Sequence, residues 1–339
     1  MSDYFPDFSP RFRKSIEALS GKTVVVIGHA RPDGDCIGSQ VALTRLLRNQ
    51  GVEVVCVNAD PCPQSLLFIA EESPFDVLNF ERIEALPLIF VDCADELRIG
   101  PETSKRLAGN EFLLNIDHHI SNTNYASTNF VSSSSSATCE LLAGMALDLG
   151  WEIDALTAEA LYTGIMTDTG RFGYVATSSQ VFDICSTLVK CGAEPAKISN
   201  NLYENNPFSR LKLLERYLNS LKVCFDGKVC YGVLTQKDFA ETQSVYEQTE
   251  GFVDYARSVV GVEIGIIMEE RKTTVKGSLR AENAQMRVDQ IAAKLGGGGH
   301  ACAAGLSSNL SLSELETSLL EEVGKRFDIR KGEIISDVK

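Results

Sequence analysis

Residues 23–35 read TVVVIGHARPDGD, and the predicted fold is built outward from them. The β-branched run 23–27 is typical of a buried strand. Apolar residues at helical spacing over 37–47 predict a helix after it. Pro32 and Gly34 interrupt the pattern between these two elements and predict a turn. The stretch is therefore the start of an α/β unit in which a tight turn follows the carboxyl end of a strand.

This turn carries one imidazole and two carboxylates, from His29, Asp33 and Asp35. In open α/β sheets, ligands bind beyond the carboxyl ends of the strands. One nitrogen ligand and several hard oxygen ligands suit Mn²⁺, Mg²⁺ or Zn²⁺. The sequence Pro-Asp-Gly-Asp is also ordinary turn chemistry, so the metal interpretation requires matching groups elsewhere in the chain.

Length and composition predict two globular domains. The chain has 339 residues, of which 44% are hydrophobic and 23% are charged, and a domain averages roughly 150 residues. No apolar run approaches the about 18 residues that a membrane span needs, and the first residues contain no apolar signal core. The ten cysteines show no Cys-x-x-Cys spacing, which favours reduced thiols in a cytoplasmic protein over disulfides or a zinc site.

The net charge of −14 restricts the partners that the protein can take. It argues against a large surface that coats nucleic acid. A small phosphate-bearing substrate is compatible with it if metal ions and a few local cations hold the phosphate. Residues 271–294 offer such cations because they contain six basic and two acidic side chains, although a basic stretch is most often a solvated face.

Two further predicted strands also end on side chains that can bind metals. The apolar runs 86–91 and 111–116 are followed by Asp92 and by the triplet Asp117-His118-His119. Strands that alternate with helices predict a mainly parallel sheet. We therefore expect these side chains to meet the turn at 28–35 along one edge of that sheet.

Two other segments of the first domain bear on the site. Five serines at 132–136 precede a predicted helix over 137–149. Their hydroxyl and N–H groups could hold an anion, but simple N-capping explains them as well, and we favour capping. A later predicted helix ends in the stretch 164–172, which contains Asp168, a separate carboxylate that is followed three residues on by Arg171.

An asparagine-rich segment, residues 195–207, predicts a domain boundary. We expect a first domain over residues 1–195, a linker and connecting helix over 196–221, and a second domain over 222–339. In the second domain, Asp226-Gly227 predicts a two-residue hairpin turn.

Four glycines stand at 296–299, directly before His300. Glycine permits left-handed backbone and close approach, which suits a loop around a ligand. A flexible helix stop would explain the same residues.

All four histidines of the chain fall inside these motifs. The set His29-x-x-x-Asp33-x-Asp35, Asp92, Asp117-His118-His119 and Asp168 resembles the four motifs of the DHH phosphoesterase superfamily. The run from Gly296 to His300 resembles the signature of the DHHA1 domain that follows it there. The resemblance extends over residues 21–327, and it is greatest to the group of bifunctional oligoribonucleases and pAp phosphatases, the nanoRNases.

This resemblance implies two divalent metal ions, Mn²⁺ in the first place and Mg²⁺ as the alternative. One ion would be held by His29, Asp33 and Asp92. The second ion would be held by Asp35, Asp92, His118 and Asp168, so that Asp92 bridges the pair. Asp117 would fix neighbouring groups, and His119 would face the scissile phosphate as a donor. Asp92, Asp117 and His119 would thus form the catalytic set.

The resemblance also implies a set of nucleotide-binding residues. In the second domain these would be Arg280, Gly298, Gly299 and His300. Arg171 is a weaker candidate from the first domain. The substrate would lie in the cleft between the two domains.

The sequence therefore predicts an α/β protein with a parallel-sheet DHH domain, a smaller α/β DHHA1 domain and an active site in the interdomain cleft. The predicted activity is hydrolysis of short RNA oligonucleotides to nucleoside 5′-monophosphates, together with dephosphorylation of 3′-phosphoadenosine 5′-phosphate (pAp) to AMP. Two alternatives are a cyclic-dinucleotide or pApA phosphodiesterase and a non-catalytic nucleotide sensor. A RecJ-like exonuclease is disfavoured by length, and a family II pyrophosphatase by the glycine–histidine ending. The oligomeric state stays open, with a homodimer as one option.

Overall fold

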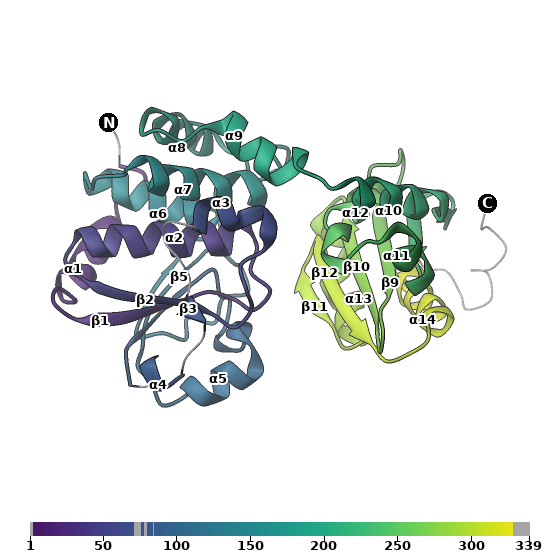
Figure 1. Cartoon of the computed structure of the whole chain (residues 1–339), viewed down its shortest axis with the longest axis horizontal. Coiled ribbons are helices and arrows are strands. Elements are labelled where there is room, and N and C mark those ends of the chain that lie inside the picture. The colour runs from purple at the N-terminus through teal and green to yellow at the C-terminus, as the bar shows by residue number, and fades with distance from the viewer. Residues whose placement is uncertain (1–2, 71–75, 78–79, 84, 328–339) are drawn as a thin grey trace. The chain divides into compact units, whose positions relative to one another are not determined.

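The computed structural model describes residues 3–70, 76–77, 80–83 and 85–327. The chain divides into two compact units, Met1–Asn205 and Asn206–Lys339, and each has its own sheet (Figure 1). The division falls inside the segment expected to be a linker and connecting helix. That segment is largely helical, because α9 (Pro195–Ser199) and a π-helical turn (Asn200–Glu204) lie in the first unit and α10 (Phe208–Asn219) lies in the second.

A six-stranded parallel sheet forms the centre of the first unit, as predicted. Its strand order is β3-β2-β1-β4-β5-β6, and every neighbouring pair is parallel. The strands are β1 (Thr23–Ile27), β2 (Glu53–Asn58), β3 (Asp76–Val77), β4 (Leu88–Val91), β5 (Phe112–Asp117) and β6 (Thr128–Val131). The sequence pattern missed β3 and β6. In β6 only Phe130 is buried, so this edge strand lacks the continuous apolar run of a strand covered on both faces.

Helices cover both faces of this sheet (Figure 1). The helices α2 (Gly34–Asn49), α6 (Thr138–Asp148) and α7 (Ala155–Asp168) lie on one face, and α5 (Pro101–Leu107) lies on the other. Val24 and Val26 pack into the core on the first face, whereas Val25 and Ile27 pack into the core that contains Leu107. The strands are thus apolar on both sides, and polar side chains concentrate at their ends.

The other helices of the first unit are short or peripheral. They are α1 (Ser9–Glu17), α3 (Leu67–Ala70), α4 (Phe80–Ile83) and α8 (Ser179–Lys190), with 3₁₀ turns at Gln64–Leu66 and Glu96–Ile99.

The start of α7 is held by Asp154. Its side chain accepts a hydrogen bond from the Thr157 N–H at 2.9 Å and forms an ion pair with Arg45 of α2. Although partial burial opposes ionisation, hydrogen bonds from Arg45 and Thr157 lower the pKa of Asp154 to about 2. Because this folded-state pKa lies below the unfolded value, the stabilisation is present above pH about 4 and is lost as the pH falls towards 2.

We expect Asp154→Ala to lower the free energy of unfolding by about 1–2 kcal/mol at pH 7, since it removes an N-cap. Urea unfolding at pH 7 and pH 3 measures this loss, which should be smaller at pH 3. Asp183→Ala is the matched control. Asp183 is an exposed residue of α8 whose side chain has no partner within the described residues, so its loss should stay within about 0.5 kcal/mol. Equal losses in the two variants would contradict the capping role.

The second unit contains a six-stranded mixed sheet with the order β11-β12-β10-β9-β8-β7. Only β8 and β9 pair in parallel, and the other four neighbouring pairs are antiparallel. The strands are β7 (Lys222–Cys224), β8 (Val229–Leu234), β9 (Ile264–Glu270), β10 (Val275–Ala281), β11 (Gly298–His300) and β12 (Ala303–Ser308).

Two cores flank this sheet. α13 (Val288–Lys294) and α14 (Leu312–Gly324) contribute to one of them, and α10 and α12 (Phe252–Arg257) contribute to the other. The remaining helices are α11 (Gln236–Thr242) and 3₁₀ turns at Tyr246–Thr249, Ala284–Met286 and Lys325–Phe327. Within the part of the chain that the structure describes, no helix has the length and apolar character needed to cross a membrane.

The hairpin predicted around Asp226-Gly227 is present, but its turn is longer than two residues. β7 and β8 pair antiparallel, and residues 225–228 connect them. Phe225, Asp226 and Gly227 all have positive φ, at 52°, 53° and 86°. An Asp-Gly pair marks the turn reliably, but the third left-handed residue, Phe225, gives no such signal in the sequence.

The glycine run starts directly after the end of α13, as the helix-stop alternative predicts, and its last two residues, Gly298 and Gly299, lie in the edge strand β11. A Cβ atom on Gly297 would lie 2.2 Å from the Gly305 carbonyl oxygen. A Cβ atom on Gly299, where φ is 147°, would lie 2.4 Å from the Ala303 carbonyl oxygen. The glycines therefore allow β11 to approach β12 more closely than side chains would permit.

Candidate metal centre at the strand ends

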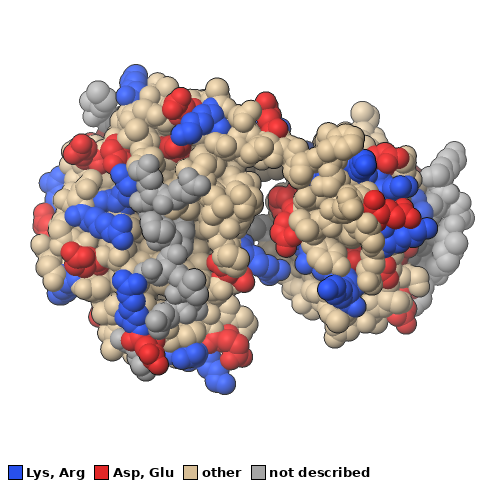
Figure 2. Space-filling view, in the orientation of Figure 1, with Lys and Arg blue, Asp and Glu red and all other residues tan. Residues whose placement is uncertain are grey.

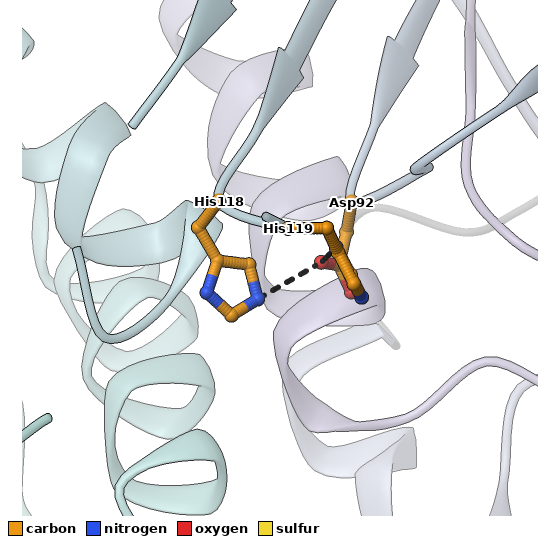
Figure 3. A group of neighbouring side chains, drawn as sticks. All are labelled: Asp92, His118 and His119. Atoms are coloured by element: carbon orange, nitrogen blue, oxygen red, sulfur yellow. Dashed lines mark ion pairs between the residues drawn. The ribbon is translucent and has the colours of Figure 1, made fainter. Parts of the chain in front are cut away.

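The predicted metal-capable residues meet at the carboxyl edge of the parallel sheet. The strands β1, β4 and β5 are neighbours, and they are followed or ended by His29, Asp92 and Asp117. Figure 3 shows His118 and Asp92 at the ends of adjacent strands with their polar atoms facing each other. The start of α2 and the last residue of α7 add carboxylates to the same place.

The first group of donors is His29, Asp33 and Asp92. The His29 Nε2 atom lies 3.6 Å from Asp33 Oδ1 and 3.3 Å from Asp92 Oδ2. The other ring nitrogen, Nδ1, is 2.9 Å from the Ala30 carbonyl oxygen, which requires the proton to be on Nδ1. Nε2 is therefore the ring nitrogen that faces the two carboxylates.

The second group of donors is Asp35, His118 and Asp168. The His118 Nε2 atom lies 3.2 Å from Asp168 Oδ2 and 3.9 Å from Asp35 Oδ2, while its Nδ1 faces the Ser135 carbonyl oxygen at 3.3 Å. The same Nε2 atom is 3.5 Å from Asp92 Oδ1. Asp92 thus directs one oxygen to each group, so the two groups share this single buried carboxylate.

The amino end of α6 holds Asp35. The backbone N–H groups of Thr138 and Cys139 donate to its two oxygens at 2.6 and 2.9 Å. The N-cap residue of this helix is Ala137, and it offers no side-chain cap, so the capping role favoured for the serines is wrong. The helix amino end does bind an anion, as in the alternative interpretation, but the anion is a carboxylate of the protein itself.

The third histidine, His119, is bound to Asp117. Its Nδ1 lies 2.6 Å from Asp117 Oδ1 and 3.6 Å from Asp92 Oδ1. Asp92, His118 and His119 are also close enough to surround an ion. However, Nδ1 of His119 donates to Asp117 and so cannot also bind a metal. Asp117 and His119 therefore form a hydrogen-bonded pair beside Asp92.

Electrostatics favour a cation at this centre. Asp35 and Asp92 are buried, and no Lys or Arg among the described residues pairs with them or with Asp168. Burial and the repulsion from neighbouring carboxylates raise the pKa of Asp35, and the same causes raise the pKa of Asp168 to about 6. Burial opposes protonation of His118, yet Asp168 and the other carboxylates raise its pKa. Such crowded acids are the donor set of a divalent metal site.

Three buried polar residues that support the centre escaped the sequence analysis. The Asn58 Oδ1 atom accepts the N–H of Gly28 at 3.2 Å, and the Asn58 amide donates to Gln40 Oε1 at 2.6 Å. Gln40 is fully buried in α2, and a large polar residue among the apolar residues of a predicted helix is a signal that could have identified it. The Thr138 hydroxyl lies 3.2 Å from Asp92 Oδ1, and no sequence pattern links these two residues.

The predicted nucleotide-binding residues lie outside this cluster. Arg171 has φ at 60°, and its guanidinium lies over the Tyr203 ring, 3.7 Å from the centroid. Arg280 is half-buried on β10 of the second unit, and Gly298 and Gly299 are in β11. The side chain of His300 lies outside the described residues.

Comparisons with known proteins agree with this geometry. Residues 23–165 match the model of the DHH family N-terminal domain, and residues 226–327 match that of the DHHA1 domain. The bifunctional oligoribonuclease and PAP phosphatase NrnA of Thermus thermophilus is 31% identical over 313 residues, 91% of each chain. The solved structure of an exopolyphosphatase-related protein from Bacteroides fragilis has a TM-score of 0.85 and 27% identity, covering 94% of this chain and 95% of that one.

A more distant solved structure shares the fold alone. RecJ from Thermus thermophilus, solved in complex with Mn²⁺, has a TM-score of 0.51 and 12% identity. The aligned region includes 98% of this chain and 56% of the RecJ chain.

Proposed function

Since this chain belongs to the DHH family and continues into a DHHA1 domain, we propose that it is a phosphoesterase that hydrolyses short RNA oligonucleotides to nucleoside 5′-monophosphates and converts pAp to AMP. The observation that carries this proposal is the pair of donor groups that share Asp92. The relative from Thermus thermophilus, whose name states both activities, covers nearly the whole chain. A cytoplasmic location is part of the proposal and is supported by ten free cysteines.

We assign the two donor groups to two divalent metal ions, Mn²⁺ in preference to Mg²⁺. His29, Asp33 and Asp92 would hold one ion. Asp35, Asp92, His118 and Asp168 would hold the other. Imidazole nitrogen combined with carboxylate oxygen suits Mn²⁺ better than a site built only of oxygens. When bound, such a pair of ions generates a nucleophile from water at neutral pH and neutralises charge that develops on the phosphate.

His119 and Asp117 would act on the scissile phosphate without holding a metal. In this role, Nδ1 of His119 donates to the buried carboxylate of Asp117, and Nε2 would donate to a phosphate oxygen. The 2.6 Å bond between them fixes the orientation of the ring. A donor held in this way stabilises negative charge without reorganising during the reaction.

The second unit would bind the nucleotide part of the substrate. Arg280 forms no ion pair within the described residues, so its charge is not neutralised by the protein there. A Cβ atom on Gly298 would meet no atom within 4 Å, which leaves room for a ligand against the backbone of β11. We assign Arg280, Gly298, Gly299 and His300 to this role, and Arg171 of the first unit to a lesser one.

The charge distribution favours short substrates. On the face shown in Figure 2, Lys and Arg side chains are interspersed with Asp and Glu and form no continuous basic track. A net charge of −14 disfavours long single strands, which bind along extended positive grooves. A few metal and arginine contacts suffice for a substrate of one to five nucleotides.

Metal-dependent hydrolysis tests this proposal. The protein is stripped with EDTA, reloaded with Mn²⁺ and incubated with pAp, with di- to pentanucleotides and with a long single-stranded RNA. We expect AMP and phosphate from pAp, 5′-mononucleotides from the short RNAs, and a much lower specificity constant for the long RNA. The EDTA-treated protein should be inactive until metal is restored.

Cyclic dinucleotides provide the comparison substrate. If the metal-loaded protein cleaves them with a higher specificity constant than pAp and short RNA, the substrate assignment is wrong while the reaction class stands. If all substrates stay intact after Mn²⁺ loading, the assignment as a phosphoesterase is wrong.

A further inference from the structure

The loop after His119 contains a residue, Asn122, whose polar groups all have partners. The Asn122 amide donates to Asp117 Oδ2 at 2.6 Å and to the Cys93 carbonyl oxygen at 3.2 Å. Its Oδ1 atom accepts the N–H of Asn124 at 2.7 Å. One partly buried side chain therefore connects the end of β5 with the turn after β4.

The first connection fixes His119 through Asp117. Asp117 is fully buried, and its two oxygens accept separate hydrogen bonds, one from His119 Nδ1 at 2.6 Å and one from Asn122 at 2.6 Å. A carboxylate held at both oxygens cannot rotate about its bond to Cβ. The position of the Nδ1 proton of His119 is thus set by a residue that does not touch the ring.

The second connection fixes the turn that carries Asp92. The φ angle of Asp92 is 56°, in the left-handed region that non-glycine residues rarely adopt. Such strain persists only where the surroundings hold it. The Cys93 carbonyl oxygen accepts bonds from Asn122 and from the Tyr125 hydroxyl at 3.2 Å, and Thr123 N–H donates to the Ala94 carbonyl oxygen at 3.0 Å.

We propose that Asn122 is a positioning residue for phosphoester hydrolysis, because it holds the Asp92 turn and the Asp117–His119 pair in one fixed arrangement. The expected loss of kcat rests on the proposed function, whereas the expected change at His119 does not. Asn122 acts through Asp117 and Cys93, and the reacting atoms contact the residues that it holds. Its loss should therefore affect turnover more than substrate binding.

Kinetics of Asn122→Ala test the proposal. We expect kcat for pAp in Mn²⁺ to fall by about 10–100-fold, the usual effect of losing a group that orients a metal-site residue, with KM changed by less than about threefold. The matched control is Asn129→Ala in β6, the strand that follows this loop. Asn129 donates to the Ala126 and Asn124 carbonyl oxygens at 2.7 and 3.2 Å and touches neither Asp117 nor Cys93. Equal losses of kcat in both variants would reduce Asn122 to general loop support and overturn the proposal.

A readout independent of activity separates this inference from the proposed function. Long-range ¹H–¹⁵N NMR of the Mg²⁺-loaded protein reports which ring nitrogen of His119 carries a proton. We expect a protonated Nδ1 in the wild type and in Asn129→Ala, and a mixture of ring states in Asn122→Ala. An unchanged His119 spectrum in Asn122→Ala would overturn the inference, even if the wild type hydrolyses every substrate. If the wild type hydrolyses none, the function fails, while the spectra still decide the role of Asn122.

A double-mutant cycle adds a third criterion. Because Asn122 acts in part through His119, removing it from the His119→Ala protein should cost less kcat than removing it from the wild type. If Asn122→Ala lowers kcat by the same factor in the His119→Ala protein as in the wild type, Asn122 does not act through Asp117 and His119.

Discussion

Asp92→Asn is expected to lower kcat/KM for pAp and for short RNA by at least about 10³-fold, because the two metal ions proposed for this centre would supply several kcal/mol of transition-state stabilisation and each 1.36 kcal/mol corresponds to a factor of ten. Asp92 directs Oδ2 towards His29 at 3.3 Å and Oδ1 towards His118 at 3.5 Å. No other carboxylate among the described residues faces both groups in this way. An amide at this position has one oxygen fewer and adds a donor where a cation should lie.

The electrostatic environment strengthens this expectation. Although burial opposes ionisation, hydrogen bonding to His29 and the charges of His119 and His118 lower the pKa of Asp92 below its ordinary range. Asp92, like Asp33, therefore favours the ionised form, while Asp35 and Asp168 have raised pKa values. Its replacement removes the negative charge on which the two ligand groups depend.

Steady-state kinetics and Mn²⁺ titration calorimetry measure the effect of Asp92→Asn. The matched control is Asp95→Asn, which removes one charge from the same turn while an asparagine can still cap the following 3₁₀ helix, as Asp95 does. The control should keep its activity within about threefold. An Asp92→Asn protein that binds Mn²⁺ and turns over like the wild type would contradict the shared-ligand arrangement. If it loses turnover but still binds pAp, binding depends on residues other than the metal ligands.

The sequence predicted the cluster of metal-capable residues because these residues follow local patterns. Buried parallel strands appear as short β-branched runs, as at 23–27, and the polar residue that ends each run marks the sheet edge. Chain topology then brings His29, Asp92 and His118 together without further information. The same logic failed for β6, whose residues are mostly half-buried.

Residues that act through tertiary contacts could not be predicted in this way. Thr138 contacts Asp92 across 46 residues of sequence, and Asn58 supports Gly28 across 30. The glycines at 296–299 indicated that another backbone segment lies close to them. Only the structure shows that this segment is β12. Likewise, the serines before α6 indicated a helix start, whereas its bound anion, Asp35, lies 103 residues away from Thr138.

The spacing of the carboxylates on α2 and α7 depends on glycines where these helices meet. Asp35 is near the start of α2, and Asp168 is the last residue of α7. A Cβ atom on Gly38 of α2 would lie 2.5 Å from the Ala160 carbonyl oxygen. A Cβ atom on Gly164 of α7 would lie 2.3 Å from Cys139 Sγ and 2.8 Å from Asp35 Oδ1. Both glycines therefore allow a helix approach that no larger residue permits.

We expect Gly164→Ala to lower kcat by about 10²-fold, the cost of displacing a catalytic group by roughly 1 Å, and to lower the free energy of unfolding by about 1–3 kcal/mol. Alanine would gain about 1 kcal/mol of helix propensity over glycine, so the sign depends on whether Asp35 and Cys139 can move. They cannot move independently, because the N–H groups of Thr138 and Cys139 hold the Asp35 carboxylate at 2.6 and 2.9 Å.

Gly109→Ala is the matched control, since its added methyl group would meet nothing within 4 Å. If the Gly164→Ala protein is as stable and active as the Gly109→Ala protein, the centre tolerates a shift of Asp35. That outcome would contradict the proposal that Asp35 must keep its position relative to Asp92.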